Sequence, residues 1–295
     1  MSASAATIVA PSRSRLGPLV RRFLAHRLAV LGLAVVVVLC AAALFAPWIA
    51  PHDPVELDTK LRFLAPGQRA GFPLGTDEIG RDTLSRLLYG GRVSLTIGLV
   101  AMLTTVATGA LVGVVSGYLG GWTDTVLMRF VDTMLCFPQV FLLLVVAAFI
   151  PPTLLSMSLI IGLTSWMEVA RIVRSEVLYL REQDFVAAAR ALGASNARIM
   201  LRELLPNTMA PILVAATLKV ASAVLMESYI SYLGYGVQPP LASWGAMLGT
   251  AFPYMAQSPT PTIAAGVVIS VTVLCFNLIG DGIRDSVGRM RRAGD

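Results

Sequence analysis

The chain has 295 residues, of which 56% are hydrophobic and only 14% are charged, and its formal net charge is +6. A water-soluble domain normally carries about 25% charged residues, so this deficit indicates a chain that lies in a bilayer. The positive charge is typical of cytoplasmic loops and does not indicate a nucleic-acid partner, because the basic residues are not interleaved with aromatic side chains.

Six apolar segments are long enough to cross a membrane, since a helix needs about 20 residues to span roughly 30 Å of hydrocarbon. They cover residues 28–46, 93–117, 126–149, 153–172, 209–233 and 262–280. We therefore predict an all-α integral membrane protein with six transmembrane helices. No small-residue cleavage site follows the basic N-terminal run, which favours an uncleaved first span over a signal peptide.

Arginine distribution predicts the orientation of these spans. Arginines gather in three places: the N-terminal tail (Arg13, Arg15, Arg21, Arg22, Arg27), the segment after the fourth span (Arg174, Arg181, Arg190, Arg198, Arg202) and the C-terminal tail (Arg284, Arg289, Arg291, Arg292). Cytoplasmic loops are enriched in such residues, so both termini are predicted to be cytoplasmic. The predicted regions are a tail (1–27), a first span with an extracytoplasmic segment (28–92), a transmembrane core (93–283) with an insert at 182–207, and a second tail (284–295).

The segment between the first and second spans carries several prolines and ends in Asp77–Tyr89, where apolar residues alternate with charges. This pattern predicts a short helix on the outer surface. Trp48 and Trp244 are expected at the outer interface, as in an aromatic belt. Pro151 and Pro152 are expected to turn the chain between the third and fourth spans.

Ionisable residues inside spans are costly and often mark a functional path. In the fifth span, Lys219 and Glu227 are eight residues apart and too far around the helix to pair. They are predicted to line a translocation path, or, for Glu227, to reach headgroups or a neighbouring donor. Asp281 is expected to end the sixth span. Two local pairs are predicted from a spacing of three residues: Arg129 with Asp132, and Glu168 with Arg171.

Glycines spaced four apart in the second span, at Gly109, Gly113 and Gly117, predict a flat stripe for close helix packing, within this chain or against a partner subunit. Metal and disulfide chemistry is not expected. Cys40, Cys136 and Cys275 lie in apolar runs without CxxC spacing and are expected to be small buried hydrophobes, while His26 and His52 fall on opposite sides of the first span.

The sequence contains no GxxxxGK[ST] phosphate-binding loop, because neither Lys60 nor Lys219 follows a glycine. This chain is therefore not expected to bind ATP or Mg²⁺ itself, and no catalytic group, cofactor or metal is predicted in it. Any ATP-driven activity would need a separate ATPase polypeptide.

The insert at 182–207 is too polar to cross a bilayer. Its alanines at 187–191 favour a helix that ends at Gly193, and a second helix, 196–205, is expected to start at the N-cap Ser195 and to finish before Pro206. Two short helices joined at a glycine would form a rigid projection that offers a surface to a soluble partner. An ordinary amphipathic loop is the alternative.

AAARALGASNARIMLRELLPN, within this insert, resembles the Glu-Ala-Ala motif of type-1 ABC importer permeases. Ala188, Ala189, Gly193, Leu205 and Pro206 match the motif, whereas Ala187 stands where the family has glutamate. In that family the loop is the coupling helix that docks on an ATPase subunit. Three other stretches are similar to the C-type subunit of dipeptide, oligopeptide and nickel permeases: PLGTDEIGRDTLSRLLYGGRVSL, ESYISYLGYGVQPPLASWGAML and FNLIGDGIRD.

The resemblance implies a permease subunit of the bacterial inner membrane that works with a second homologous permease, two ABC ATPases that bind ATP and Mg²⁺, and an extracytoplasmic substrate-binding protein. It implies peptides as the solute, with nickel, glutathione or another small solute as alternatives. A stand-alone secondary transporter is a weaker alternative, because the sequence shows no internal inverted repeat.

Overall fold

The computed structural model describes the backbone of residues 16–291 and the side chains of residues 20–287. Parts of the predicted basic tails lie outside this range: Arg13, Arg15 and Arg292, and the side chains of Arg289 and Arg291. The described chain is helical, and its β structure is a single antiparallel bridge between Thr76 and Asp82.

The first half of the described chain forms α1 (Leu16–Ala25), α2 (Arg27–Leu44), α3 (Ala46–Ile49), the 3-10 turn η1 (Thr59–Leu61), α4 (Thr83–Leu119), α5 (Gly121–Leu135) and α6 (Gln139–Phe149). The second half forms α7 (Leu154–Leu163), α8 (Trp166–Leu180), α9 (Asp184–Ala191), α10 (Asn196–Arg198), the π-helical turn η2 (Ile199–Leu204), α11 (Leu205–Asn207), α12 (Met209–Tyr232), α13 (Trp244–Ala251), the 3-10 turn η3 (Phe252–Tyr254) and α14 (Pro259–Arg291).

Four helices are long and apolar enough to cross a membrane: α2, α4, α12 and α14. Two further crossings are bent pairs, α5 with α6 at 87° and α7 with α8 at 45°, which gives six spans if each pair counts as one. The third and fourth predicted spans are thus each bent at a break, which was not predicted from the sequence. Pro138 lacks a backbone donor and restrains the residue before it, and Ser165 donates its hydroxyl to the Ile161 carbonyl at 2.6 Å.

The predicted surface helix at 77–89 is also wrong. α4 begins at Thr83, where the Asp82 carboxylate accepts the Ser85 N–H at 2.8 Å, and it continues without a break to Leu119. Before it lies a tight turn with Gly80 at φ 86°, where a Cβ would come within 1.8 Å of the Asp58 carbonyl. Only glycine fits there, so the charged residues of this segment form a turn.

α4 is the central helix, and its glycine stripe packs against α8 within this chain. A Cβ at Gly113 would lie 2.6 Å from the Ala170 carbonyl oxygen, and at Gly109 and Gly117 the nearest atoms belong to Val169 and Val177. The valines of α8 are buried there with the inner ends of α4 and α12. The missing side chains let two helix backbones approach closely, which fixes α8 on α4.

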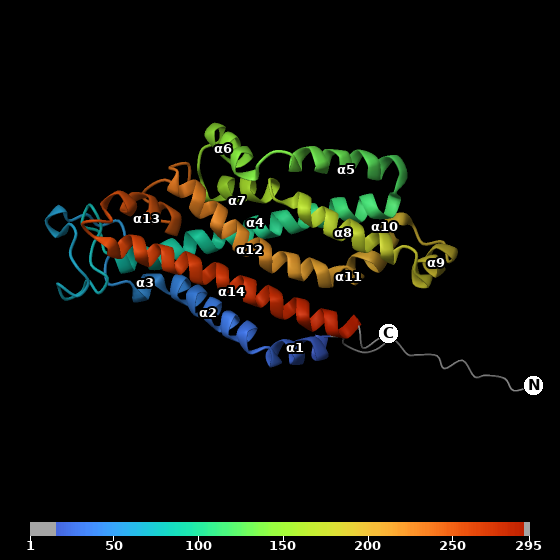
Figure 1. Cartoon of the computed structure of the whole chain (residues 1–295), viewed down its shortest axis with the longest axis horizontal. Coiled ribbons are helices and arrows are strands. Elements are labelled where there is room, and N and C mark those ends of the chain that lie inside the picture. The colour runs from blue at the N-terminus through green and yellow to red at the C-terminus, as the bar shows by residue number, and fades with distance from the viewer. Residues whose placement is uncertain (1–15, 292–295) are drawn as a thin grey trace, which may run out of the picture.

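The molecule is elongated, and its two ends differ (Figure 1). At the loop end lie α3, α13 and the 50–82 segment; at the projection end lies α9, with the last turns of α14 in the same half of the molecule. Two expectations fail here. Trp244 is buried in the bundle, and Cys136 is exposed. α14 continues as a helix to Arg291, and the end of the sixth span at Asp281 stays a prediction.

Candidate functional site

The projection, residues 182–207, stands out at one end of the molecule (Figure 1). Its first helix, α9, ends where predicted, since Gly193 adopts φ 77°. Ser195 caps the next helix by accepting the Arg198 N–H at 3.4 Å. The predicted stop before Pro206 is wrong: η2 and α11 carry helical structure through Pro206, which is accommodated at the first turn of α11.

The projection is held on the bundle by buried apolar side chains. Val186, Ile199 and Leu204 are fully buried and pack with residues of α4, α8 and α12. Polar contacts add to this packing, since the Tyr118 hydroxyl donates to the Asn196 Oδ1 at 3.0 Å and Arg181 Nη1 donates to the Gly117 carbonyl at 3.0 Å. The projection is thus a rigid extension of the spans.

Of the residues that match the motif, Ala188, Gly193 and Pro206 are exposed, and Ala189 and Leu205 are half-buried. The most exposed large apolar side chain in the projection is Leu192, at 88%. Leu192 was not identified from the sequence as a residue that could contact a partner. Leu192 lies six residues after the buried Val186, about 120° away around the helix, so a helical wheel could have indicated that it faces outward.

The charges inside the spans pair between helices. Lys219 Nζ lies 2.5 Å from Glu168 Oε2, which joins α12 to α8, and Arg171 pairs with Asp132, which joins α8 to α5. The local pairs predicted from spacing are therefore wrong, because Asp132, Glu168 and Arg171 each pair with a side chain on a neighbouring helix. Further along α8, two guanidinium nitrogens of Arg174 donate to Asp124 at 2.6 Å each.

Glu227 lies inside the chain, with no exposed surface. Its carboxylate accepts hydroxyl donors from Ser94 at 2.9 Å and from Ser231 at 2.7 Å. Ser94 also accepts the Trp244 N–H at 3.2 Å, so this group ties α4, α12 and α13 together. The prediction that Lys219 and Glu227 line a path stays a prediction, and in this conformation the surroundings of Glu227 are protein.

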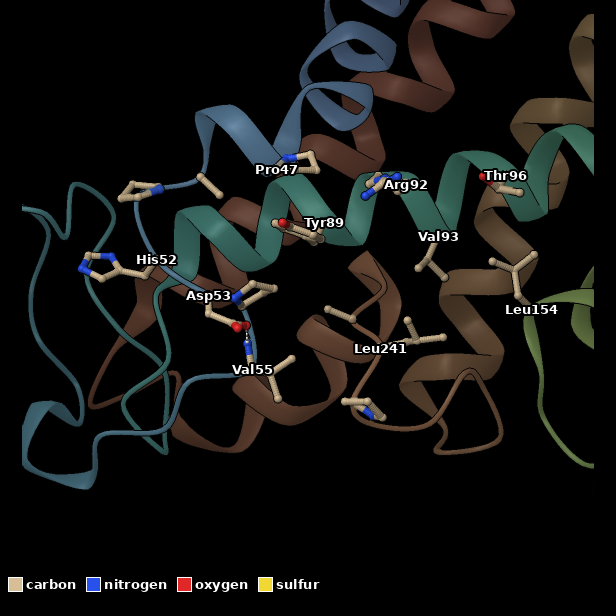
Figure 2. Close-up of a pocket in the computed structure, with 15 residues that line it drawn as sticks. Pro47, His52, Asp53, Val55, Tyr89, Arg92, Val93, Thr96, Leu154 and Leu241 are labelled. Atoms are coloured by element: carbon tan, nitrogen blue, oxygen red, sulfur yellow. Dashed lines mark hydrogen bonds between the residues drawn. The ribbon is translucent and has the colours of Figure 1, made fainter.

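A cavity of about 850 Å³ opens at the loop end (Figure 2). α4 supplies one wall with Tyr89, Arg92, Val93 and Thr96, and the rest comes from the 47–55 segment, Leu154 and the 240–242 loop. The 47–92 and 234–261 segments, which are far apart in the sequence, therefore both contribute to one hollow.

A buried ion cluster, the Asp77 cluster, fixes the start of α4 at the loop end. Asp77 pairs with Arg86 and, at 2.7 Å, with Arg81, which also reaches Glu78 at 3.1 Å. Burial raises the pKa of Asp77, but the charges of Arg86 and Arg81 outweigh it and hold this pKa below its ordinary value. The cluster is a structural anchor for the loop end.

Among residues 16–291, no group of three His, Cys, Asp or Glu side chains could hold a metal ion. His26 lies 3.6 Å from Asp285 instead. The geometry thus offers surfaces and a cavity, with a rigid projection at one end.

Comparison with known proteins matches residues 109–292 to the family of binding-protein-dependent transport system inner membrane components. Residues 15–66 match the N-terminal transmembrane domain of oligopeptide transport permease C. A dipeptide transport system permease protein of Alkalihalophilus pseudofirmus is 36% identical over 89% of this chain and 86% of its own length. A di/tripeptide transport system permease protein of Pseudomonas aeruginosa is 38% identical over 87% of this chain and 86% of its own length.

A solved structure shows the same fold. The MetNI methionine ABC transporter in inward-facing conformations aligns with a TM-score of 0.54 and 19% identity, over 68% of this chain and 96% of the matched chain.

Proposed function

This chain belongs to the family of binding-protein-dependent transport system inner membrane components, and from that premise we propose that it is the C-type permease subunit of an ATP-driven importer for dipeptides or oligopeptides. The names of the relatives favour peptides over the nickel and glutathione alternatives. The chain is a membrane component that acts with other ABC subunits and forms half of the translocation path.

The finer assignment has three further parts. The partners are a second homologous permease, two ABC ATPases that bind ATP and Mg²⁺, and an extracytoplasmic binding protein. The projection end and both termini face the cytoplasm. The loop end faces the binding protein, and the 850 Å³ cavity receives the released peptide.

The observation that carries the proposal is the projection itself. It buries three apolar anchors against the spans and presents Leu192 to solvent. An exposed apolar side chain on a rigid support is typical of a contact that another protein covers. Through those anchors, movement of the docked partner displaces α4, α8 and α12 together.

A cross-linking experiment on the assembled transporter tests this role. Cysteine at Leu192, in a chain whose native cysteines are replaced, is expected to cross-link to the ATPase subunit. Leu57 is the matched control, since it is also an exposed leucine, at 61%, but lies at the loop end. Cross-links to the ATPase from position 57 and none from position 192 would overturn the proposed orientation.

The same pair of positions tests coupling. Leu192→Asp is expected to lower ATP-driven peptide uptake by about tenfold or more, since loss of a central apolar contact costs at least about 1.4 kcal/mol. Leu57→Asp should leave coupling to the ATPase unchanged. Uptake by proteoliposomes that contain no ATPase would contradict the proposed function.

A further inference from the structure

Charged side chains form a continuous strip on the side of the bundle where α5 lies. The charged strip consists of Asp124, Arg129, Asp132, Glu168, Arg171, Arg174 and Lys219. It begins at the Lys219–Glu168 pair and ends at the Arg174–Asp124 pair, with positive and negative groups alternating through Arg171 and Asp132. Much of it is open, because the side chains of Glu168, Arg171 and Asp132 are 64%, 51% and 47% exposed.

One end of the strip, the Lys219–Glu168 pair, lies far from the helix ends. Lys219 is ten residues into α12, about 15 Å from its start beside the projection, and Glu168 is twelve residues before the end of α8, about 18 Å from the same end. A charge that faces lipid at such depth is costly. This end of the strip must therefore face water or another protein.

Two broken spans meet beside the strip. Gln139, just after the break between α5 and α6, donates its amide to the Ser165 hydroxyl, in the break between α7 and α8, at 2.6 Å. Both residues share a small cavity with Glu168 and Lys219. Non-helical backbone at membrane depth is tolerated where it is buried in protein or lines a water-filled space.

A larger hollow of about 490 Å³ follows the strip toward the projection end, lined by Asp124, Arg129, Asp132, Arg171 and Arg174 with Thr125 and Met128. The exposed charges, the adjoining breaks and this hollow all lie on one face of the chain. Lipid would leave the open charges of Glu168, Arg171 and Asp132 without solvation, whereas an aqueous path would solvate them.

We propose that the charged strip is the water-facing wall of the translocation path and the contact site for the charged ends of a zwitterionic solute. Glu168 and Asp132 take the ammonium group, and Lys219 and Arg171 take the carboxylate. This inference rests on the proposed function. It keeps Lys219 as a path residue, removes Glu227, and adds six charged residues of α5 and α8.

The Arg171–Asp132 pair suits transient contact. Both side chains are about half exposed, and a solvent-exposed pair is weak, so a passing ammonium or carboxylate can displace one partner without a large barrier. One turn earlier on α8, the Lys219–Glu168 pair is open on its Glu168 side, where the side chain is 64% exposed.

Thiol labelling tests whether the charged strip is in contact with water. Single cysteines at Met128 and Met134, which line the two hollows, are introduced in a chain without native cysteines, and the complete transporter is embedded in lipid nanodiscs. The matched control is Val38→Cys on α2, which is 65% exposed on the opposite side of the bundle from α5 (Figure 1). A charged methanethiosulfonate should label the strip positions at least about tenfold faster, because reaction needs a thiolate and therefore water.

Equal, slow labelling at all three positions would overturn the proposal, and would indicate that the second permease covers the strip.

A second experiment tests whether the strip contacts the solute. Glu168→Gln should lower uptake of a peptide with a free amino group by about tenfold or more relative to the same peptide N-acetylated, since the variant loses a charge-assisted hydrogen bond to the ammonium group. Equal losses for the two peptides would overturn the contact role.

The two proposals fail separately. A transporter that takes up no peptide would contradict the proposed function, while fast labelling at Met128 would still establish a wet wall. Slow labelling in a complex that imports peptide would contradict the strip alone.

Discussion

The Asp77 cluster and the Arg171–Asp132 pair of the charged strip are built from the same residue types but differ in exposure. Asp77, Arg86 and Arg81 are 5%, 7% and 14% exposed, whereas the Asp132 and Arg171 side chains are about half exposed. An enclosed charge without a partner is very costly, so the first group must remain paired throughout the cycle. Exposed pairs can open at little cost. The same kinds of ion pair thus form a fixed anchor in the Asp77 cluster and a pair that can exchange partners at Arg171 and Asp132.

The largest effect that follows from this comparison concerns the anchor. Asp77→Asn should lower the free energy of unfolding in mixed detergent micelles by about 3–5 kcal/mol, because it leaves the enclosed Arg86 without its counter-charge. Glu56→Gln, at an exposed carboxylate in the same loop, should change it by less than about 0.5 kcal/mol. Similar values for the two variants would remove the distinction between enclosed and exposed charges.

The next largest effect on stability concerns the close packing of α4 against α8, which carries part of the strip. Gly113→Ala should destabilise the protein by about 1–3 kcal/mol, since the new Cβ would lie 2.6 Å from the Ala170 carbonyl oxygen and force α8 away from α4. Gly266→Ala is the control on α14, where no atom lies within 4 Å of the added methyl group. Thermal unfolding of both purified variants measures the difference, and a neutral Gly113→Ala would show that the strip has no fixed support.

Lowering the pH should remove the stabilising contribution of Asp77. The pKa of Asp77 is lowered in the folded protein, so its contribution to stability is fully present above the ordinary value of 3.8 and is lost as the pH falls through the lower, folded value. Unfolding free energies measured downward from pH 5 should fall more steeply in the wild type than in Asp77→Asn. Parallel curves would exclude Asp77 as a source of acid sensitivity.

The smallest effect belongs to the strip. A double-mutant cycle with Arg171→Gln and Asp132→Asn should give a coupling energy below about 1 kcal/mol, since both side chains are half exposed to water. A coupling of several kcal/mol would mean that the pair is enclosed in the assembled transporter, and the contrast with the Asp77 cluster would disappear.

The sequence correctly predicted the features that depend on local composition. The lengths of apolar runs indicated six crossings, and Gly193 indicated where α9 ends. Side-chain partners on neighbouring helices could not be predicted in this way. Spacing along one helix suggested Glu168 with Arg171, but the partner of Glu168 comes from α12, 51 residues away.

The candidate site shows the same limit. The motif identified the projection, but the exposure of Leu192 follows from how Val186 and Ile199 pack beneath it. Trp244 was expected at an interface because its ring is amphipathic; instead its indole N–H donates to the Leu87 carbonyl at 2.9 Å, which satisfies the polar atom inside the protein. Such partners come from distant segments, and a single sequence does not reveal them.

α4 gives the molecule a mechanical property. Its 37 residues form one uninterrupted rod about 55 Å long, anchored by the Asp77 cluster at one tip and by the Tyr118–Asn196 contact at the other. A stiff rod cannot tilt at one tip while the other stays still. In the proposed importer, this one helix therefore connects the end assigned to the binding protein directly with the end assigned to the ATPase, and movement at either end is passed on as displacement of the whole helix.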